Sequence, residues 1–370
     1  MKRIGVVSYN IHCNFTNYGS ALQSWALCKT IERLGYKPVL MDYCPDVLRD
    51  ANPLDPFKKM WDKDAESRRM CELTLPAIRE NYYKFDRFYT ERFNRSHAYT
   101  SENFNDCVGA EGLCGFVCGS DTIFCIDEFK GFEDGYYANY SCMKGNSVAY
   151  GASFGDSHFK PADYDILNDR LQNFKAIALR ENLMVPYVSS HANIPVTRVT
   201  DPTLLLTAED YNSITSSGDA VYRGGYLLLY TRRYNPKLES FAINYAAKHG
   251  LRVVEISLRA KNADIGHDMR YDAGVEEFLA LMRGASFVVT NSFHGLIFAV
   301  QYSRPFAVFS RESGDSKIGE VLELFGLSDR LIHDGAEYRD REFNFAKVHE
   351  RIDSARRQSI EFLKMELSLL

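Results

Sequence analysis

The sequence predicts an α/β protein made of two Rossmann-like lobes with parallel sheets that face a cleft. Apolar strand segments alternate with helical periodicities along the whole chain, a pattern typical of parallel α/β folds. The alternation breaks around 202–224, where proline, serine and glycine cluster, and then restarts. A length of 370 residues suits two domains. We therefore predict an N-terminal lobe over 1–205, a C-terminal lobe over 220–342 and a C-terminal helix over 343–370.

The first lobe begins with one βαβ unit. Residues 3–8 form an apolar strand segment, and residues 18–34 carry apolar side chains at helical spacing before Gly35. A second strand is expected over 38–43. Residues 46–105 are rich in charge and tyrosine and predict a helical insertion on this lobe. Further strands are expected at 114–118, 147–152 and 174–179.

The second lobe repeats the rhythm of strand and helix. Its last stretch, 343–368, is amphipathic, and we expect this helix to pack back across the first lobe. Ligands of such sheets bind outside the carboxyl ends of the strands, so polar residues that follow a strand are site candidates. The strands are expected at 226–230, 251–257, 286–290 and 305–309, and the helices at 236–249, 275–283 and 293–303.

Composition excludes several classes of protein. Apolar residues make up 45% and charged residues 25% of the chain, which are values of a folded globular protein. No segment has the ~18 unbroken apolar residues of a membrane-spanning helix. The first residues lack the apolar core of a signal peptide, so we expect a cytoplasmic protein. The net charge of −5 argues against nucleic acid as a partner.

The nine cysteines suggest neither a disulfide framework nor a metal centre. Nine is an odd number, and the spacing of four clustered cysteines matches no common zinc pattern. Cys114 and Cys118 lie in an apolar run, where we expect buried thiols that behave as small hydrophobic groups. We predict reduced thiols and no metal. The four clustered cysteines are Cys107, Cys114, Cys118 and Cys125.

The most informative segment runs from the strand at 286–290 into the next helix. Asn291 or Ser292 is expected to cap the helix, whose free backbone N–H groups and dipole favour an anion. His294 falls in the first turn, where a histidine can reach a ligand and exchange protons near neutral pH. A lone histidine more often bonds a neighbouring loop, but this placement favours a functional role.

A second polar segment joins the first strand to the first helix. Thr16, Asn17, Gly19 and Ser20 crowd another helix N-terminus, and Gly19 permits close approach of a ligand. The repeated glycines of a dinucleotide-binding fingerprint are absent. The alternative is a simple capping turn over which Tyr18 packs.

Other candidates follow further strands. Gly119-Ser120-Asp121 comes directly after the strand at 114–118 and adds polar groups to the first lobe. An anionic substrate would need several basic groups to converge on it. The candidates for that role are Arg180, Arg232, Arg233 and Lys317.

Together these segments resemble the polysaccharide pyruvyl transferase family. The resemblance extends from residue 17 to about residue 330, and the Ser-Phe-His-Gly segment with the early Asn-Tyr-Gly segment is its most specific part. The segments that carry it are Asn17-Tyr18-Gly19-Ser20-Ala21-Leu22-Gln23, Gly119-Ser120-Asp121, Tyr150-Gly151-Ala152-Ser153-Phe154-Gly155, Arg180-Glu181, Asp201-Pro202-Thr203-Leu204-Leu205, Glu277-Phe278-Leu279, Thr290-Asn291-Ser292-Phe293-His294-Gly295 and Lys317-Ile318.

The resemblance implies a fold like that of type-B glycosyltransferases (GT-B). It also implies transfer of a pyruvyl group from phosphoenolpyruvate to a sugar, as a cyclic ketal, with release of phosphate. It gives His294 and Arg180 catalytic roles and places the donor near His294. Phosphoenolpyruvate is then a substrate, and no cofactor is expected. Lys317 is the donor-binding residue that the resemblance implies, and Arg232, Asn291 and Ser292 are added because they follow strands of the second lobe. The expected acceptor-side residues are Asn17, Tyr18, Gly19, Gln23, Ser120 and Asp121.

The chain departs from the family pattern at two places. Many relatives have Arg-Leu-His where this chain has Ser292-Phe293-His294, so donor charge must be balanced by other groups. Relatives often continue Gly-Ser-Asp with Gln and an aromatic residue, whereas Thr122-Ile123-Phe124 follow here. His294 is expected to act as the acid or to stabilise phosphate. Asp121 is one option for the base that activates a sugar hydroxyl.

Two alternative functions remain open at this stage. The fold also suits a GT-B glycosyltransferase with a nucleotide-sugar donor. A non-catalytic relative that binds a sugar or a lipid carrier is the other, and the missing arginine at Ser292 favours it. The acceptor sugar is open as well. A lipid-linked acceptor would bring the protein to the inner face of the cytoplasmic membrane, where five aromatic residues could make contact unless they are the packed face of a helix. They are Tyr82, Tyr83, Phe85, Phe88 and Tyr89.

Overall fold

The computed structural model describes most of the chain and divides it into two compact units. Unit 1 comprises Met1–Ala51, Tyr89–Leu206 and Asp353–Leu370, and unit 2 comprises Asn52–Phe88 and Thr207–Ile352. The residues described are 1–13, 15–55, 65–215, 224–231, 234–310, 315–333, 336 and 338–370.

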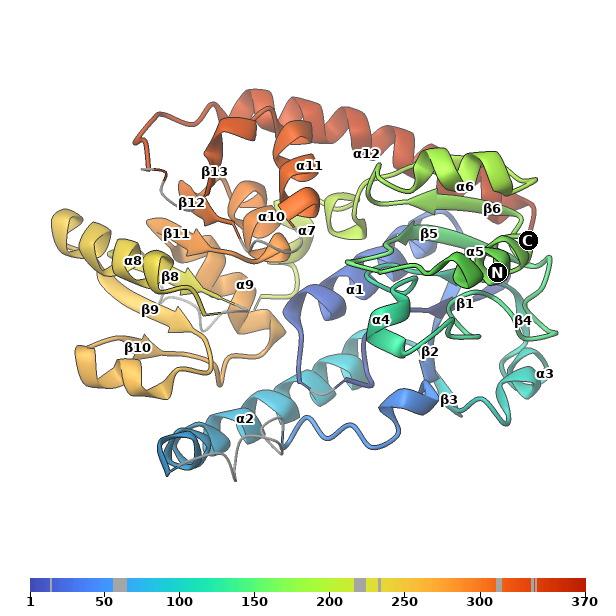
Figure 1. The fold of residues 1–370 in the computed structure, drawn as a ribbon, viewed down its shortest axis with the longest axis horizontal. Helices are drawn as coiled ribbons and strands as arrows, with labels where there is room; N and C mark the ends of the chain where they lie inside the picture. The colour runs from blue at the N-terminus through green and yellow to red at the C-terminus, as the bar shows by residue number, and fades with distance from the viewer. Residues whose placement is uncertain are drawn as a thin grey trace. The chain divides into compact units, whose positions relative to one another are not determined.

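Unit 1 is built on a parallel sheet of seven strands in the order β3-β2-β1-β4-β5-β6-β7 (Figure 1). The central strands β4, β5 and β6 are largely apolar and buried, because both faces of a parallel sheet are covered by helices. The strands are β1 (Arg3–Val7), β2 (Lys37–Tyr43), β3 (Arg95–Tyr99), β4 (Leu113–Cys118), β5 (Ser147–Ala152), β6 (Ala176–Leu179) and β7 (Val196–Arg198).

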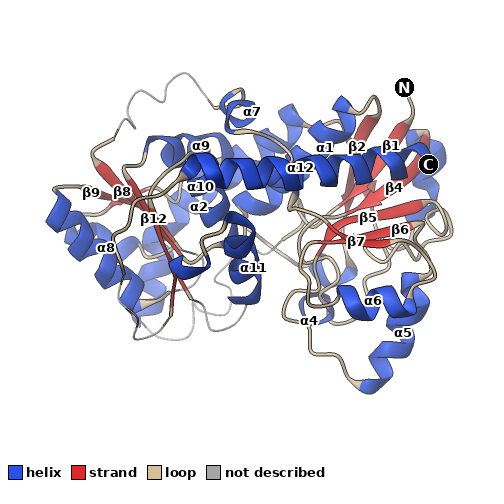
Figure 2. Cartoon of the chain, turned by 90° about the horizontal axis from the view of Figure 1, so that it is seen from above, coloured by secondary structure: helices blue, strands red, loops and turns tan. Residues whose placement is uncertain are grey.

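Unit 2 has a second parallel sheet of six strands in the order β10-β9-β8-β11-β12-β13. Figure 2 shows β8, β9 and β12 of this sheet among the helices of the unit. Every residue of its central strands β8 and β11 is buried. The strands are β8 (Tyr226–Tyr230), β9 (Arg252–Ile256), β10 (Asp268–Met269), β11 (Phe287–Thr290), β12 (Phe306–Phe309) and β13 (Leu331–Ile332).

Helices connect the strands and cover the sheets. Most α-helices follow a strand and return the chain for the next parallel strand, as crossover connections require. The α-helices are α1 (Tyr18–Arg33), α2 (Ala65–Arg92), α3 (Cys107–Glu111), α4 (Ile126–Phe129), α5 (Pro161–Leu171), α6 (Val185–His191), α7 (Ala208–Asn212), α8 (Pro236–His249), α9 (Val275–Gly284), α10 (Phe293–Gln301), α11 (Asp315–Phe325) and α12 (Phe345–Ser368).

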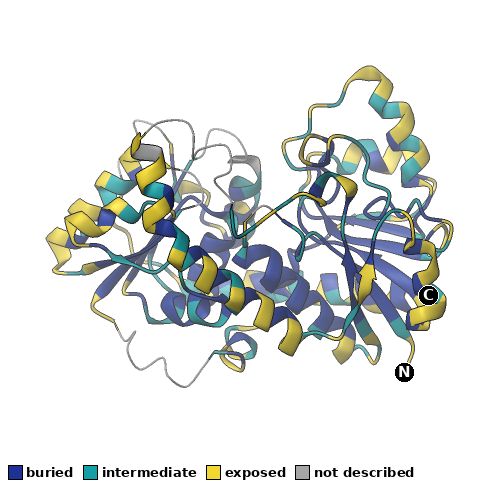
Figure 3. Ribbon diagram, turned by 90° about the horizontal axis from the view of Figure 1, so that it is seen from below, coloured by how far each residue is buried: buried dark blue, intermediate teal, exposed yellow. Residues whose placement is uncertain are grey.

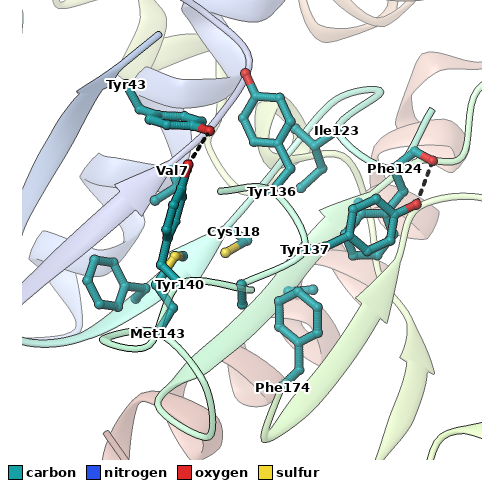
Figure 4. Packing of buried hydrophobic residues seen from close by; sticks show 14 of the residues in the cluster. Val7, Tyr43, Cys118, Ile123, Phe124, Tyr136, Tyr137, Tyr140, Met143 and Phe174 are labelled. Atoms are coloured by element: carbon teal, nitrogen blue, oxygen red, sulfur yellow. Dashed lines mark hydrogen bonds between the residues drawn. The ribbon is translucent and has the colours of Figure 1, made fainter. Parts of the chain in front are cut away.

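One face of the sheet in unit 1 carries an aromatic core. Tyr43 contacts Phe104 edge to face at 5.0 Å between ring centroids, and Phe124 stacks on Tyr137 at 4.4 Å (Figure 4). The Tyr137 hydroxyl donates to the Phe124 carbonyl at 2.8 Å. Buried tyrosines need such partners, and aromatic pairs stabilise a core beyond their area. This core fixes the strands whose carboxyl ends carry the polar site.

The strands β8, β11 and β12 at the centre of the unit 2 sheet are buried, and buried residues are dark blue in Figure 3. Leu227 and Leu229 of β8 pack with Leu238 of α8 on one face. On the other face Tyr230 contacts Phe278 of α9, at 5.1 Å between ring centroids. Phe278 in turn contacts Phe298 of α10, so α9 and α10 cover this face together.

The predicted helical insertion over 46–105 is divided between the two units. Its long helix α2 begins in unit 2, where Asn81 donates to the Ala273 carbonyl and Lys84 lies 2.8 Å from the Glu277 carboxylate. Phe85 and Phe88 are buried and Tyr83 is exposed. Assignment of the whole insertion to the first lobe was therefore wrong, because long-range contacts of 52–88 decide where it belongs.

The amphipathic C-terminal helix α12 begins in unit 2 and ends in unit 1. Within unit 1, Ser359 accepts from the Thr200 backbone N–H at 3.0 Å, and Phe362 lies against Tyr150. Arg356 donates to the Leu204 carbonyl at 2.7 Å. The end of α12 thus packs on the face of the unit 1 sheet opposite the aromatic core.

Two further sequence expectations can be compared with the structure. Cys118 is fully buried, but Cys114 is exposed. The expectation for Cys114 was wrong because this residue lies near the start of β4, where the pairing with β1 shifts register and skips position 114. None of the helices within the described ranges has an apolar stretch that could span a membrane.

Candidate functional site

The polar residues of unit 1 gather where the order of its strands reverses. β1 pairs with β2 on one side and with β4 on the other, and Val7 lies opposite Cys118. The loops that follow β1 and β4 therefore leave the sheet next to each other. This is the switch point of a doubly wound sheet, where ligands bind.

Gln23 of α1 ties these loops together. Its side-chain amide donates to Ser8 Oγ at 2.7 Å, and its carbonyl oxygen accepts from the Ser120 backbone N–H at 3.0 Å. The same amide also contacts Ser24 and the Ser20 carbonyl. Gln23 is fully buried. Its hydrogen bonds are made within the protein, so its observed role is to position the loop around Ser120.

The Gly119-Ser120-Asp121 turn has a backbone that only glycine permits at its first position. Gly119 has a φ of 137°, and a Cβ there would collide with the Tyr150 carbonyl oxygen. Asp121 follows with a φ of 74° and accepts from Ser20 Oγ at 2.8 Å. The turn thereby holds the Asp121 carboxylate at the carboxyl edge of the sheet, beside the N-terminus of α1.

Arg180 lies at the same edge, after β6, among three carboxylates. Its guanidinium contacts Glu181 at 2.6 Å, Asp201 at 3.0 Å and Asp121 at 3.6 Å. Burial works to lower the pKa of Arg180, but Glu181, Asp201 and Asp121 outweigh it and raise that pKa. One buried cation balances three acidic groups here. In this arrangement Arg180 holds Asp121 in place, together with Asp201, which caps the short helical turn Pro202–Leu204.

The acceptor-side residues expected from the sequence lie together in unit 1. The Asn17 side chain caps α1 by accepting from the Gly19 backbone N–H at 3.1 Å. Tyr18 and Gly19 are buried at the start of the same helix, next to Ser20, which bonds Asp121. Arg180 belongs to this cluster and not to unit 2, where Asn291, Ser292 and Lys317 lie.

Sequence analysis did not single out one further polar group at this edge. His12 Nε2 lies 2.6 Å from Asp42 Oδ1, and Arg95 Nη2 lies 2.7 Å from the other carboxylate oxygen. No motif indicated this group, because His12 and Asp42 are separated by 30 residues. The one available signal was the position of each polar residue at or just after a strand.

In unit 2 the order of strands reverses between β8 and β11. Thr290, the last residue of β11, donates from its hydroxyl to the Tyr230 carbonyl at 2.7 Å and accepts from the Ser292 backbone N–H at 3.0 Å. Ser292 caps α10 by accepting from the Gly295 N–H at 3.2 Å. The predicted cap is confirmed, and it is Ser292. Asn291 is buried beside it.

His294 occupies the first turn of α10 at this switch point. Its ring is mostly buried and meets Phe293 edge to face at 5.1 Å. Lys317 lies on α11 and is partly exposed. Arg232 and Arg233, which sequence analysis placed after β8, lie outside the described residues. Unit 2 thus brings His294, Asn291 and Ser292 to one helix N-terminus.

Gly295 makes this turn possible, and its replacement provides a first test. A Cβ at position 295 would collide with Thr290 Oγ1 and lie 2.9 Å from the Tyr230 ring. Alanine in place of glycine usually stabilises a helix interior by about 1 kcal/mol. We expect Gly295→Ala to lower the midpoint of thermal unfolding, with Gly319→Ala in the open part of α11 as the control that does not. A higher midpoint for Gly295→Ala would contradict the close packing.

No group of three or more histidine, cysteine, aspartate or glutamate side chains in the described ranges is placed to hold a metal ion. The nine cysteines all fall within those ranges, and none forms a disulfide.

These features define a two-unit α/β protein with polar groups at the switch point of each parallel sheet. The family model described as polysaccharide pyruvyl transferase matches residues 17–313, most of the chain. The chain therefore belongs to the polysaccharide pyruvyl transferase family, whose members are transferases. No curated protein matches the sequence.

Solved structures of similar fold share little sequence with this chain. A UDP-N-acetylglucosamine 2-epimerase from Rickettsia bellii is 8% identical, covers 100% of both chains and has a TM-score of 0.47. The heptosyltransferase WaaC of E. coli, solved with ADP, is 12% identical, covers 95% of this chain and 99% of its own, and has a TM-score of 0.41.

Proposed function

We propose that this protein transfers a pyruvyl group from phosphoenolpyruvate to two hydroxyls of a sugar in a polysaccharide precursor. The product is a cyclic ketal, and phosphate is released. One observation carries the proposal: the family match over 17–313 includes the Asn-Tyr-Gly, Gly-Ser-Asp and Ser-Phe-His-Gly segments, each of which lies at the carboxyl edge of a parallel sheet.

The reaction has a definite balance of protons. The two sugar hydroxyls lose two protons as two C–O bonds form to carbon 2 of the donor. One proton is gained by the former methylene carbon, which becomes a methyl group, and the other leaves with phosphate. The bond from carbon 2 to the phosphate bridge oxygen breaks, and the phosphate takes its electrons. The protein must therefore supply an acid, a base and a holder for the anions.

Unit 2 offers groups suited to the donor. The N-terminus of α10 presents backbone N–H groups and a positive dipole end, a ready site for a phosphate. His294 in that turn is proposed as the acid, or as the group that stabilises the phosphate charge. Lys317 and Arg232 are proposed to add positive charge, and Asn291 and Ser292 to orient the donor. Unit 1 is proposed to bind the acceptor sugar.

Thermal unfolding with added ligand tests the donor. A ligand that binds only the folded state adds about 2.7 kcal/mol at a hundredfold excess over its Kd. We expect phosphoenolpyruvate to raise the midpoint by several degrees, and phosphate, pyruvate and nucleotide sugars to raise it less. Lys317→Ala is expected to reduce that shift by at least half, whereas Lys248→Ala, an exposed lysine of α8, leaves it unchanged.

A clear shift with a nucleotide sugar and none with phosphoenolpyruvate would overturn the donor assignment and favour a glycosyltransferase. If neither ligand raises the unfolding midpoint, the same measurement is repeated with acceptor sugars present. A protein that then binds sugar, but neither binds phosphoenolpyruvate nor releases phosphate from it, would be a non-catalytic relative.

A further inference from the structure

His12 and Asp42 form a histidine–carboxylate pair at the carboxyl edge of the unit 1 sheet. His12 lies in the loop after β1, and Asp42 lies near the end of β2. The His12 Nε2 atom is 2.6 Å from Asp42 Oδ1. The Asp42 side chain is nearly buried, whereas that of His12 is 31% exposed. The imidazole is thus held from behind by a buried acid and reaches solvent in front.

The surroundings fix Asp42 as a charged carboxylate. Arg95 of β3 donates to Asp42 Oδ2 from Nε at 3.1 Å and from Nη2 at 2.7 Å. Burial works to raise the pKa of Asp42, but the hydrogen bonds and charges of His12 and Arg95 outweigh it, and the pKa is lowered. A charged carboxylate accepts a hydrogen bond from His12, so Nε2 carries the proton in the neutral ring.

This tautomer leaves a basic lone pair on the Nδ1 atom of His12. In the part of the chain that the structure describes, His12 Nδ1 has no hydrogen-bond partner. A carboxylate that orients one nitrogen of a histidine while the other nitrogen stays open is the arrangement of a general base. The pair therefore has the geometry to accept a proton from a ligand.

The sheet register places the pair next to the acceptor-side residues. Val6 of β1 lies opposite Leu40 of β2, so Asp42 is level with the residue that follows β1. Gly119, which begins the Asp121 turn, donates to the Val7 carbonyl at 2.8 Å from the opposite side of β1. Neighbouring strands are about 4.8 Å apart. His12 and Asp121 thus belong to loops that leave the same edge of the sheet, on either side of β1.

We propose that His12 is the general base of the acceptor side and that Asp42 is its positioning residue. This inference rests on the proposed pyruvyl transfer. In one step, a sugar O–H bond breaks and its proton passes to His12 Nδ1. The oxygen's electron pair forms the C–O bond to carbon 2 of the donor-derived oxocarbenium ion. His12 then returns the proton to solvent.

His12 is a better base here than Asp121, the residue that sequence analysis considered. The Asp121 carboxylate accepts a hydrogen bond from Ser20 at 2.8 Å and faces the Arg180 guanidinium at 3.6 Å. Both contacts engage the carboxylate oxygens of Asp121 within the protein. Asp121 is therefore suited to hold a sugar hydroxyl as a hydrogen-bond acceptor, and His12 to deprotonate one.

Charged and titratable groups also face the pair, among them Arg95 of β3 and Cys44 after β2. Burial, and then the charge of Asp42, raises the pKa of the Cys44 thiol, so this thiol stays neutral. A histidine must be neutral to accept a proton, so the proposal predicts an acid limb in the rate profile.

The test is the pH dependence of phosphate release from phosphoenolpyruvate by the full chain, with an acceptor sugar. His12→Gln keeps the hydrogen bond to Asp42, because the glutamine amide N–H takes the place of Nε2–H. The amide cannot accept a proton. We expect kcat to fall by about 10²–10⁴, KM to change little, and the acid limb to disappear. The control is His97→Asn, which removes the ring of an exposed histidine that pairs with Glu111 at 2.8 Å, and it keeps the wild-type profile.

A second variant keeps the test decisive if His12→Gln unfolds. Asp42→Asn removes the carboxylate that orients the His12 ring and selects its tautomer, so kcat should fall at least tenfold with little change in KM, and the acid limb should change its position. If the pair had only a structural role, Asp42→Asn would lower the unfolding midpoint and leave the pH profile of activity unchanged. If the wild type releases phosphate and His12→Gln keeps its kcat and profile, the base assignment is wrong. If the wild type releases none with any acceptor, the proposed function itself is wrong.

Discussion

His294→Ala is expected to lower turnover by roughly 10²–10⁴, the usual loss when an acid–base group is removed. The protein should still fold, because the features that build this turn remain. Ser292 still caps α10 through the Gly295 N–H, and Thr290 still bonds the Tyr230 carbonyl. The measurement is kcat for phosphate release from phosphoenolpyruvate, together with the midpoint of thermal unfolding.

The control for this prediction is His249→Ala. His249 ends α8 in the same unit and is exposed, so its loss should leave kcat unchanged. Near-wild-type turnover in His294→Ala would remove His294 from the mechanism. An activity loss that comes with a lower unfolding midpoint would instead indicate a packing role for the ring.

The two possible roles of His294 predict different residual behaviour. If His294 delivers a proton, the variant should lose the alkaline limb of its pH profile and show a larger solvent deuterium isotope effect. If His294 stabilises phosphate, the variant should keep the alkaline limb and the wild-type isotope effect, and added phosphate should no longer inhibit it. Comparison of the two measurements in one variant therefore separates the roles.

The buried parts of the fold could be predicted because their signal is local. The strands β1, β4, β8 and β11 are short apolar runs, and each was expected within one or two residues of its observed bounds. Helix α8 was expected over 236–249, its observed range, since Asn235 caps it and Gly250 ends it in a left-handed conformation. Caps and apolar periodicity are properties of neighbouring residues, so one sequence suffices.

The edge strands were missed for the opposite reason. β3 contains Arg95, Ser96 and His97, and most of its residues are partly or fully exposed. β10 and β13 span only two residues each. Such strands exist because a neighbouring strand offers hydrogen bonds, and this information lies elsewhere in the chain.

The candidate site divides in the same way. The polar turns after strands were predicted, because each follows its own strand directly. The partners of these polar residues could not be predicted. Arg180 contacts Asp201, which is 21 residues away in the sequence, and His12 contacts Asp42, which is 30 residues away. Sequence analysis therefore gave Arg180 to an anionic donor, whereas the folded chain surrounds it with carboxylates. Pairing across a sheet edge depends on tertiary structure and leaves no local pattern.

Replacing Arg180 by methionine is expected to have the largest effect on stability. The guanidinium is buried, and its removal leaves Asp201, Glu181 and Asp121 without their shared cation. Removing one partner of a buried ion pair costs about 3–5 kcal/mol, because the remaining charge stays desolvated. We expect a loss of unfolding free energy in that range, measured by urea unfolding at pH 7.

The pH dependence of that loss identifies its cause. Without Arg180 the carboxylates repel one another, so the pKa of at least one of them rises above its unfolded value. That acid then binds a proton more readily in the folded state, and the deficit of the variant should shrink as pH falls from 7 to 5. Adding Asp201→Asn to Arg180→Met should recover part of the loss.

The matched control is Arg170→Met, since Arg170 pairs with Asp134 alone at 2.9 Å in a more exposed position. Solvent weakens an exposed pair, so the loss should be much smaller and nearly independent of pH. If Arg180→Met loses no more stability than Arg170→Met, the three carboxylates do not depend on Arg180. The guanidinium would then be available to a ligand, and the donor role that sequence analysis gave to Arg180 would regain its support.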